Sequence, residues 1–440
     1  MKLKYVLIAA VGIAVTVLVF MSLGDPSPAP RQMTSSDPHA NCPKPATGAT
    51  KPAPVGVAGQ VVGWRGNGQG QFKDVTPPVR WTGEADDKNI KWTAEVGKNR
   101  YGSVIVVGNR LLLTSEPDTL LCLDADSGKK LWEKTNGLDQ LPQPSDAELL
   151  PADTGNATPV PVSDGKFVYA SFGSGIVACY DLDGNRKWIA HVDAEPLQYG
   201  RSGSPVLCGG KLVVSLGHLR ALDTATGAVV WQNDDAKECY GTPLAAKIGD
   251  TDVLLTPSGQ VVRASDGKVI NKSLGSLSFA SPVRDGDIAC FIDVSAYAIR
   301  LPQKASDDLG LKRLWQLDLE GIFYASPVIH NGLVYAVSNE GMFFIIDMAT
   351  GEKLSQTQLE IPSASGIPGT PATEIFSSVT LAGPYLYVFN FLGDSLVLEA
   401  SREAKQVSRN RLDEGTGGNP VFIGDRMYIR GEESLYCIGK

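Results

Sequence analysis

The sequence has little positive charge, few histidines and no paired-cysteine motif, and each shortage excludes a class of protein. Its 40 basic residues against 48 acidic ones leave a net charge of −8, whereas a nucleic-acid-binding domain needs a basic face or stripe. The four histidines share no metal-ligand spacing, and the seven cysteines contain no CxxC. These shortages argue against nucleic-acid recognition and against a sequence-encoded zinc or redox centre.

Three of the cysteines occupy equivalent places in the sequence. Cys122, Cys179 and Cys437 lie in LLCLD, VACYD and LYCIG, inside segments that read as β-strands. We expect them to be buried as small apolar residues. Disulfide pairing is the alternative, since an exported chain would permit it.

Long apolar runs are also scarce, apart from one near the N-terminus. It extends from Tyr5 to Leu23 and follows Lys2 and Lys4. About 20 apolar residues suffice to span a membrane, and flanking lysines stay on the cytoplasmic side. We therefore predict that residues 1–24 are a signal anchor, or alternatively a signal peptide cut after Gly24. Residues 25–60, rich in Pro and Ala, are predicted to be a tether without a fold of its own.

What the sequence has in abundance is turns and repeats, with 47 glycines and 28 prolines. The stretches CLDADSGKKLW (122–132), ALDTATGAVVW (221–231) and IIDMATGEKLS (345–355) share one pattern. In each, Asp and Ser/Thr can bond the nearby backbone and Gly accepts a positive φ, so each is predicted to be a hairpin turn between two strands.

A second module precedes each hairpin, with a small polar residue, usually Pro-Val, a turn and a β-rich run. Clear copies begin at Thr158, Ser204, Ser281 and Ser326, and weaker ones at Ser103, Thr242, Ser378 and Asn419. Four strands in units of about 40–45 residues are typical of β-propeller blades. We predict an all-β fold with eight four-stranded blades over residues 89–440, or seven if the copy at Ser378 is not a blade.

The end of the repeat array predicts how the ring closes. The last copy stops after its third strand, whereas an extra strand, NIKWTAEV (89–96), precedes the first copy. We expect this N-terminal strand to pair with the last blade, because closure removes exposed edges.

The segment before this strand, 61–88, contains WRGNGQG (64–70) with glycines at Gly66, Gly68 and Gly70. Alternating glycines suggest a dinucleotide loop, but that loop needs a helix behind it, and none is indicated here. We therefore interpret 61–88 as a lead-in that Trp64 and Trp81 anchor on the propeller.

These repeats resemble the quinoprotein-like (PQQ-repeat) propeller family, whose motif is Ala-x-Asp-x-x-Thr-Gly-Lys-x-x-Trp. Ala221, Asp223, Thr226, Gly227 and Trp231 match it, with Ala228 in the Lys place, and the 122–132 copy departs only at its first residue and in having Ser for Thr. The resemblance covers about four-fifths of the chain. It implies that the tryptophans dock between neighbouring blades, namely Trp92, Trp132, Trp188, Trp231 and Trp315.

The resemblance implies two functional classes. One is the quinoprotein dehydrogenases, which oxidise alcohols or sugars with PQQ and Ca²⁺, and whose alcohol-oxidising members tend to carry adjacent cysteines. The other is the cofactor-free exported scaffolds, which include the propeller subunit of the outer-membrane β-barrel assembly machinery. This sequence has no adjacent cysteines, and turn formation accounts for its repeated aspartates. We expect a non-catalytic, cofactor-free, monomeric scaffold on the periplasmic or cell-surface side, binding a protein or cell-envelope polymer, with the PQQ/Ca²⁺-dependent dehydrogenase as the alternative.

Two candidate binding regions follow from the repeat. Residues two positions before the small polar residue, or close to that place, should gather around one end of the ring: Tyr101, Asn156, Arg201, Tyr240, Phe279, Tyr324 and Phe376. They are predicted to form a ligand or partner rim, unless the rings only fill space between blades. The insertion 139–155, with Asp146, Glu148 and Asp153, is a candidate partner-binding loop or a neutral surface insertion.

Overall fold

The computed structural model describes residues 60–82, 89–142, 155–192, 194, 199–237, 240–362 and 374–439. All of them belong to one compact unit, Thr50–Lys440. Within these ranges no helix has the length and apolar content that a membrane span requires. The predicted anchor (1–24), the tether up to residue 59 and the last residues of the lead-in (83–88) lie outside the described residues.

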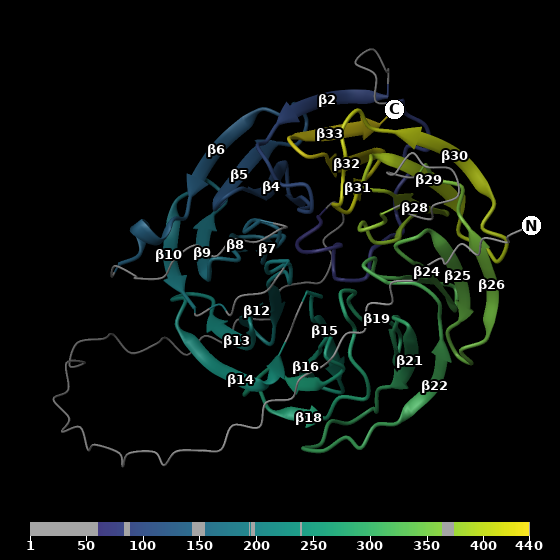
Figure 1. Cartoon of the computed structure of the whole chain (residues 1–440). Helices are drawn as coiled ribbons and strands as arrows, with labels where there is room; N and C mark the ends of the chain where they lie inside the picture. Colours follow the sequence, from purple (N-terminus) through teal and green to yellow (C-terminus); the bar gives the residue numbers. More distant parts are fainter. Residues whose placement is uncertain are drawn as a thin grey trace, which may run out of the picture. The chain divides into compact units, whose positions relative to one another are not determined.

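Eight four-stranded blades form the β-propeller, and Figure 1 shows them in chain order around the ring. The copy at Ser378 is a true blade, so the ring has eight blades and not seven. Blades 1 to 4 contain β3 (Ile105–Val107), β4 (Arg110–Ser115), β5 (Thr119–Asp124) and β6 (Lys130–Thr135); β7 (Val162–Ser163), β8 (Phe167–Ser171), β9 (Ile176–Asp181) and β10 (Arg186–His191); β11 (Val206–Cys208), β12 (Lys211–Ser215), β13 (His218–Asp223) and β14 (Val229–Lys237); β15 (Leu244–Ile248), β16 (Thr251–Leu255), β17 (Val261–Arg263) and β18 (Val269–Asn271).

Blades 5 to 8 repeat this order, and blade 8 is completed from the other end of the described chain. They contain β19 (Val283–Asp285), β20 (Ile288–Phe291), β21 (Ser295–Arg300) and β22 (Arg313–Asp318); β23 (Val328–His330), β24 (Leu333–Val337), β25 (Met342–Asp347) and β26 (Lys353–Gln358); β27 (Thr380–Ala382), β28 (Tyr385–Phe389), β29 (Asp394–Glu399) and β30 (Gln406–Arg411); β31 (Val421–Ile423), β32 (Arg426–Arg430), β33 (Ser434–Gly439) and β2 (Ile90–Glu95). Besides the strands, the described residues include one short 3-10 turn, Leu138–Gln140.

The predicted closure is confirmed, because β2 pairs antiparallel with β33 and forms the outermost strand of blade 8. The middle strands of the blades are buried along most of their length, as in β5 and β24, whereas the outermost strand β2 alternates between exposed and half-buried positions. This burial follows from blades that pack face to face, so that inner strands have no solvent-facing side.

The hairpin turns have the hydrogen bonds that the repeated motif predicts. In blade 3, Asp223 Oδ1 accepts from the backbone N–H of Thr226 at 2.9 Å and from its hydroxyl at 2.9 Å. Gly227 has φ +76°, and a Cβ on it would lie 2.6 Å from the ring of Trp188 in the preceding blade. The glycine therefore serves two purposes: it accepts a left-handed backbone, and it leaves room for the docked indole.

The docked indoles also bond the blade that they reach. Each of four indole N–H groups donates to a backbone carbonyl in the next blade at 2.8–3.0 Å: Trp132 to Leu182, Trp188 to Thr224, Trp231 to Ala264 and Trp315 to Met348. Trp92 lies on Gly128 of blade 1 in the same way. The tryptophans thus lie at blade boundaries, where their large apolar area is removed from water.

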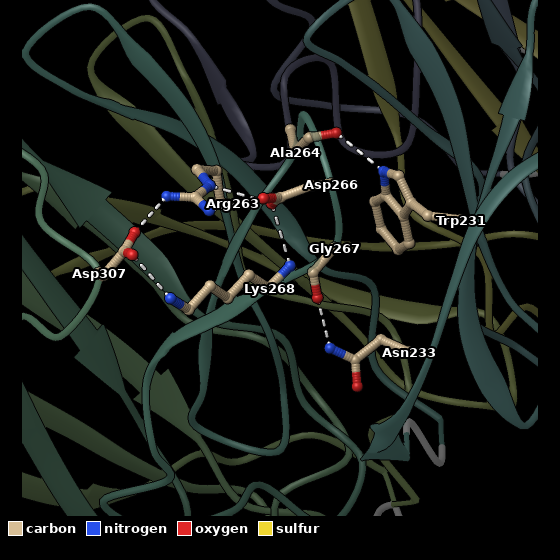
Figure 2. A network of polar contacts seen from close by, with 8 residues as sticks. All are labelled: Trp231, Asn233, Arg263, Ala264, Asp266, Gly267, Lys268 and Asp307. Carbon is tan, nitrogen blue, oxygen red and sulfur yellow. Dashed lines mark hydrogen bonds and ion pairs between the residues drawn. The ribbon is translucent and has the colours of Figure 1, made fainter.

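Blade 4 has no tryptophan in its outermost strand, and a polar network occupies this part of the boundary with blade 5. Figure 2 shows the turn of blade 4 beneath Trp231, with Arg263 and Lys268 both paired to Asp307 of blade 5, at 2.6 and 2.8 Å. These side chains are partly exposed, so the ion pairs contribute little energy. The same loop of blade 5 also bonds through its backbone, since Leu309 N–H donates to the Ile270 carbonyl at 2.8 Å.

The described cysteines are all buried and unpaired, as predicted for Cys122, Cys179 and Cys437. Burial raises the pKa of each of these three thiols to about 12. An unfolded chain has thiol pKa values near 8.5, so unfolding releases protons once the pH exceeds that value. Their contribution to stability is complete below about pH 8.5 and is lost as the pH rises toward 12.

We expect the free energy of unfolding to fall between pH 8 and pH 10.5, measured by denaturant titration at each pH. Replacing the three thiols with alanine should flatten this dependence by about 2–3 kcal/mol per thiol over the range. The buried thiols of Cys208 and Cys290, whose pKa values are also raised by burial, contribute to the remaining slope, and buried tyrosines add to it near pH 10. Equal slopes for the triple variant and the parent protein would contradict the assignment.

Candidate ligand-binding cavity

A belt of polar side chains fixes the start of each blade's first strand. The belt residues are Ser103, Ser204, Thr242, Ser281, Ser326, Ser378 and Asn419, one from each blade except blade 2. Each accepts a hydrogen bond of 2.7–3.1 Å from the backbone N–H of the equivalent residue in the preceding blade. The belt therefore sets one common register around the ring.

This register corrects the alignment of blade 2. The N–H that bonds Ser204 belongs to Val160, so the blade 2 equivalent of the belt serines is Val160 and not Thr158. The doubled Pro-Val in TPVPV (158–162) had shifted the sequence alignment by two residues. Two positions before the belt, blade 2 thus presents Thr158, where the sequence had indicated Asn156.

Those positions, two residues before the belt, line one cavity of about 350 Å³ at the end of the ring where the blades are connected. They are Tyr101, Thr158, Ser202, Tyr240, Phe279, Tyr324, Phe376 and Gly417, one from each blade. All five predicted aromatic residues belong to this set, and each is partly exposed. Asn156 and Arg201 do not line the cavity. Arg201 is only 3% exposed, and Asn156 lies beside Glu116, which accepts from its backbone N–H.

The aromatic residues form a continuous arc on one side of the cavity. Ring centroids are 5.0 Å apart for Tyr240 and Phe279, 4.5 Å for Phe279 and Tyr324, and 5.0 Å for Tyr324 and Phe376. Tyr101 continues the arc from Phe376, with ring centroids 5.6 Å apart. Two aromatic residues that the sequence did not single out pack on this arc: Tyr199 at the Tyr240 end, and Phe391 against both Phe376 and Tyr101. The gap in the arc is formed by the small residues of blades 2 and 3, Thr158 and Ser202, so the cavity has one aromatic wall.

The floor of the cavity comes from the lead-in. Residues 61–72 touch the first strands of blades 1, 2, 5, 6 and 7, and Figure 1 shows this purple segment at the centre of the ring. Trp64 lines the cavity. Arg65 beside it is buried, and its Nη2 donates to the carbonyls of Pro327 at 2.9 Å and Val379 at 2.6 Å. These two residues directly follow the belt residues Ser326 and Ser378.

Arg65 is a buried cation that has no carboxylate partner among the described residues. Burial lowers its pKa to about 9, which leaves it protonated at neutral pH. Two carbonyl groups and the ring of Trp64, 5.3 Å from Cζ, take the place of a counter-ion. The guanidinium thus fixes the lead-in at the centre of the ring through bonds to blades 6 and 7.

The chemistry of the lining does not fit PQQ with Ca²⁺. PQQ carries carboxylates, which require cationic partners, and Ca²⁺ requires several carboxylate or carbonyl oxygens. The described residues that line the cavity include no charged side chain. Nowhere in the described ranges do three His, Cys, Asp or Glu side chains gather as metal ligands would.

The second candidate region falls where the structure gives no description. Asp146, Glu148 and Asp153 belong to residues 143–154, outside the described ranges. Whether this insertion binds a partner stays a prediction, as does a binding role for the aromatic rim.

Comparison with known proteins decides the family. The family described as outer membrane protein assembly factor BamB matches residues 82–269 and 200–357. The chain belongs to this family. Its curated relatives differ in kind. A polyvinylalcohol dehydrogenase of Sphingopyxis sp. is 23% identical over 375 residues, covering 72% of this chain and 53% of the relative.

A BamB of Moranella endobia is 22% identical over 252 residues, covering 57% of this chain and 52% of the relative. The chain therefore spans about half the length of these curated relatives. The crystal structure of BamB from Moraxella catarrhalis matches with a TM-score of 0.59 at 13% identity, over 80% of this chain and 99% of that one. At such identity, the structural likeness shows the fold alone.

Proposed function

We propose that this BamB-family propeller is a non-catalytic scaffold of the cell envelope that binds a partner protein at the cavity end of the ring. The observation that carries the proposal is the cavity itself, which has an aromatic wall and a floor made by the chain's own lead-in. The described residues that line it are uncharged. Such a pocket suits an anchor residue of a protein interface. Its described lining contains no carboxylate, imidazole or amine side chain.

The family supports the location and the kind of partner. A family described as an outer membrane protein assembly factor points to an exported protein on the periplasmic side, with partners among proteins of outer-membrane assembly. The apolar segment 5–23 after two lysines is consistent with export. We propose that it also anchors the chain in a membrane.

The alternative is a PQQ-dependent dehydrogenase, which the similarity to a polyvinylalcohol dehydrogenase favours. The two functions separate in one titration of the purified full chain with PQQ and Ca²⁺. For a scaffold we expect no shift of the quinone spectrum and no dye reduction with alcohols or sugars. Saturable binding with turnover would overturn the proposed function.

Site-specific photo-crosslinking in intact envelopes tests the scaffold directly. A photoreactive residue at Tyr199, 41% exposed at the cavity, should yield a discrete crosslinked protein. Leu131 is the matched control, since it is 47% exposed but lies on β6 at the outer edge of blade 1. The same crosslinking pattern at both positions would contradict binding at the cavity end.

A further inference from the structure

The cavity opens in one direction, because the lead-in crosses the centre of the ring beneath it. Trp64 lines the floor, and Arg65 ties this segment to blades 6 and 7 through the Pro327 and Val379 carbonyls. A ligand therefore enters from the end where the blades are connected. It meets the aromatic arc on one side and the small residues Thr158 and Ser202 on the other.

The hydrogen-bonding groups around the cavity are largely occupied by the fold. The belt oxygens of Ser204, Thr242 and Ser281 accept backbone N–H groups of the neighbouring blades at 2.8–3.0 Å. The hydroxyl of Ser202 donates to the Tyr240 carbonyl at 2.9 Å. A sugar ring needs several directional partners to replace its bound water, whereas an apolar group needs only the surface of the aromatic wall.

The described lining of the cavity carries no charged side chain, so a charged ligand group would find no ionic partner there. Burying a charge without a partner is costly. The charges that do lie nearby have opposite signs: the protonated Arg65 lies beside Trp64 of the floor, and Glu340 and Glu374 act on Tyr324, whose pKa is raised mainly by burial and further by Tyr199 and these carboxylates. The lining therefore favours a neutral ligand.

Several exposed apolar residues lie near the opening. Ile322 is 46% exposed two residues before Tyr324, and Tyr199 packs against Tyr240 and Phe279. Val294 is 51% exposed next to Asp293, whose carboxylate accepts from Ser278 N–H beside Phe279. Exposed apolar residues around an aromatic pocket are typical of protein interfaces.

Resting on the proposed scaffold function, we infer that the cavity is an anchor pocket for one large uncharged side chain, aromatic or aliphatic, carried by a loop of the partner protein. The side chain lies between the arc centred on Phe279 and Tyr324 and the small residues opposite. The partner's backbone crosses Ile322 and Tyr199. Because the pocket is preformed on a closed ring, little binding free energy is spent on rearranging the propeller.

Blocked amino acids test the pocket without knowledge of the partner. N-acetyl-tryptophanamide and N-acetyl-leucinamide should bind the full chain in ligand-observed NMR and calorimetry, at least tenfold more tightly than the lysine and glutamate amides or maltotetraose. Phe279→Ala, which shortens the wall, and Ser202→Phe, which fills the open side, should each weaken tryptophanamide binding about tenfold. Leu131→Ala at the outer edge should not change it.

The outcomes separate this inference from the proposed function. Tighter binding of maltotetraose or of a charged amide, or equal binding by the Phe279→Ala, Ser202→Phe and parent proteins, overturns the anchor pocket. The crosslink at Tyr199 then still tests the scaffold. Retained tryptophanamide binding without any protein crosslinked at Tyr199 overturns the scaffold. Thermal unfolding of both variants identifies a variant that fails to fold, and the other then gives the result.

Discussion

Gly70→Ala should lower the free energy of unfolding by roughly 3–5 kcal/mol. Gly70 has φ +68°, where an L-residue costs about 1–2 kcal/mol. A Cβ there would also lie 2.6 Å from Cζ of Arg65, and this side chain is enclosed and bonded to two blades. Displacing it overpacks the centre of the ring and leaves the Pro327 and Val379 carbonyls without their donor.

Gly66→Ala provides the matched control four residues earlier. Gly66 also has a positive φ, +77°, but a Cβ there would only reach Phe72 at an ordinary 3.8 Å. In this variant the free energy of unfolding should fall only by the cost of the left-handed backbone, about 1–2 kcal/mol. Denaturant unfolding of both variants gives the difference that belongs to Arg65. Equal losses would show that Arg65 can move aside and does not hold the lead-in.

Trp81→Ala should cost about 3–5 kcal/mol, the usual range for removing a buried large aromatic side chain. Trp81 is 3% exposed and stacks on Tyr387 and Phe389 of blade 7. Blade 7 has Ser408 where blades 1, 2, 3, 5 and 8 have their docking tryptophan. The backbone N–H of Trp81 donates to Asn410 Oδ1 of β30 at 3.0 Å. The lead-in thus supplies from outside the repeat the aromatic ring that blade 7 lacks.

Two phenylalanine variants separate the packing of Trp81 from hydrogen bonding. The indole N–H of Trp81 has no acceptor among the described residues, so Trp81→Phe should lose only part of the packing, about 1–2 kcal/mol. Trp231→Phe loses in addition the bond to the Ala264 carbonyl, worth about 1 kcal/mol. Calorimetric unfolding should therefore place Trp81→Phe above Trp231→Phe in stability, and the reverse order would contradict this account.

The variants Gly70→Ala and Gly66→Ala also test why WRGNGQG (64–70) is rich in glycine. The spacing resembled a phosphate loop, but each of its three glycines has a positive φ in a segment without a helix. The tight turns let Trp64 form the floor of the cavity while Arg65, the next residue, bonds the lead-in to the centre of the ring. The segment therefore helps to build the cavity and also joins the chain to the ring.

Part of the candidate site followed from spacing alone. The repeat placed Tyr101, Tyr240, Phe279, Tyr324 and Phe376 at one position of successive units, and equivalent positions in a propeller meet at one end of the axis. Asn156 was misplaced because the belt register, which depends on bonds between blades, cannot be read from TPVPV. Arg201 lies one residue before the lining position Ser202, and it is buried and does not line the cavity. Tyr199 and Phe391 carry no repeat signal, so only their contacts reveal them.

The sequence by itself determined the architecture, because a β-propeller is encoded unit by unit. The turn chemistry of Asp223 and Gly227 and the recurrence of the motif are local features, and eight local units with one strand displaced to the front specify a closed ring. The tertiary structure decided what fills the ring. Arg65, Gln69 and Gln71 bond residues more than 200 positions away, and no local pattern predicts such partners. The cavity's floor, its single opening and its uncharged lining exist only once distant blades meet around that lead-in.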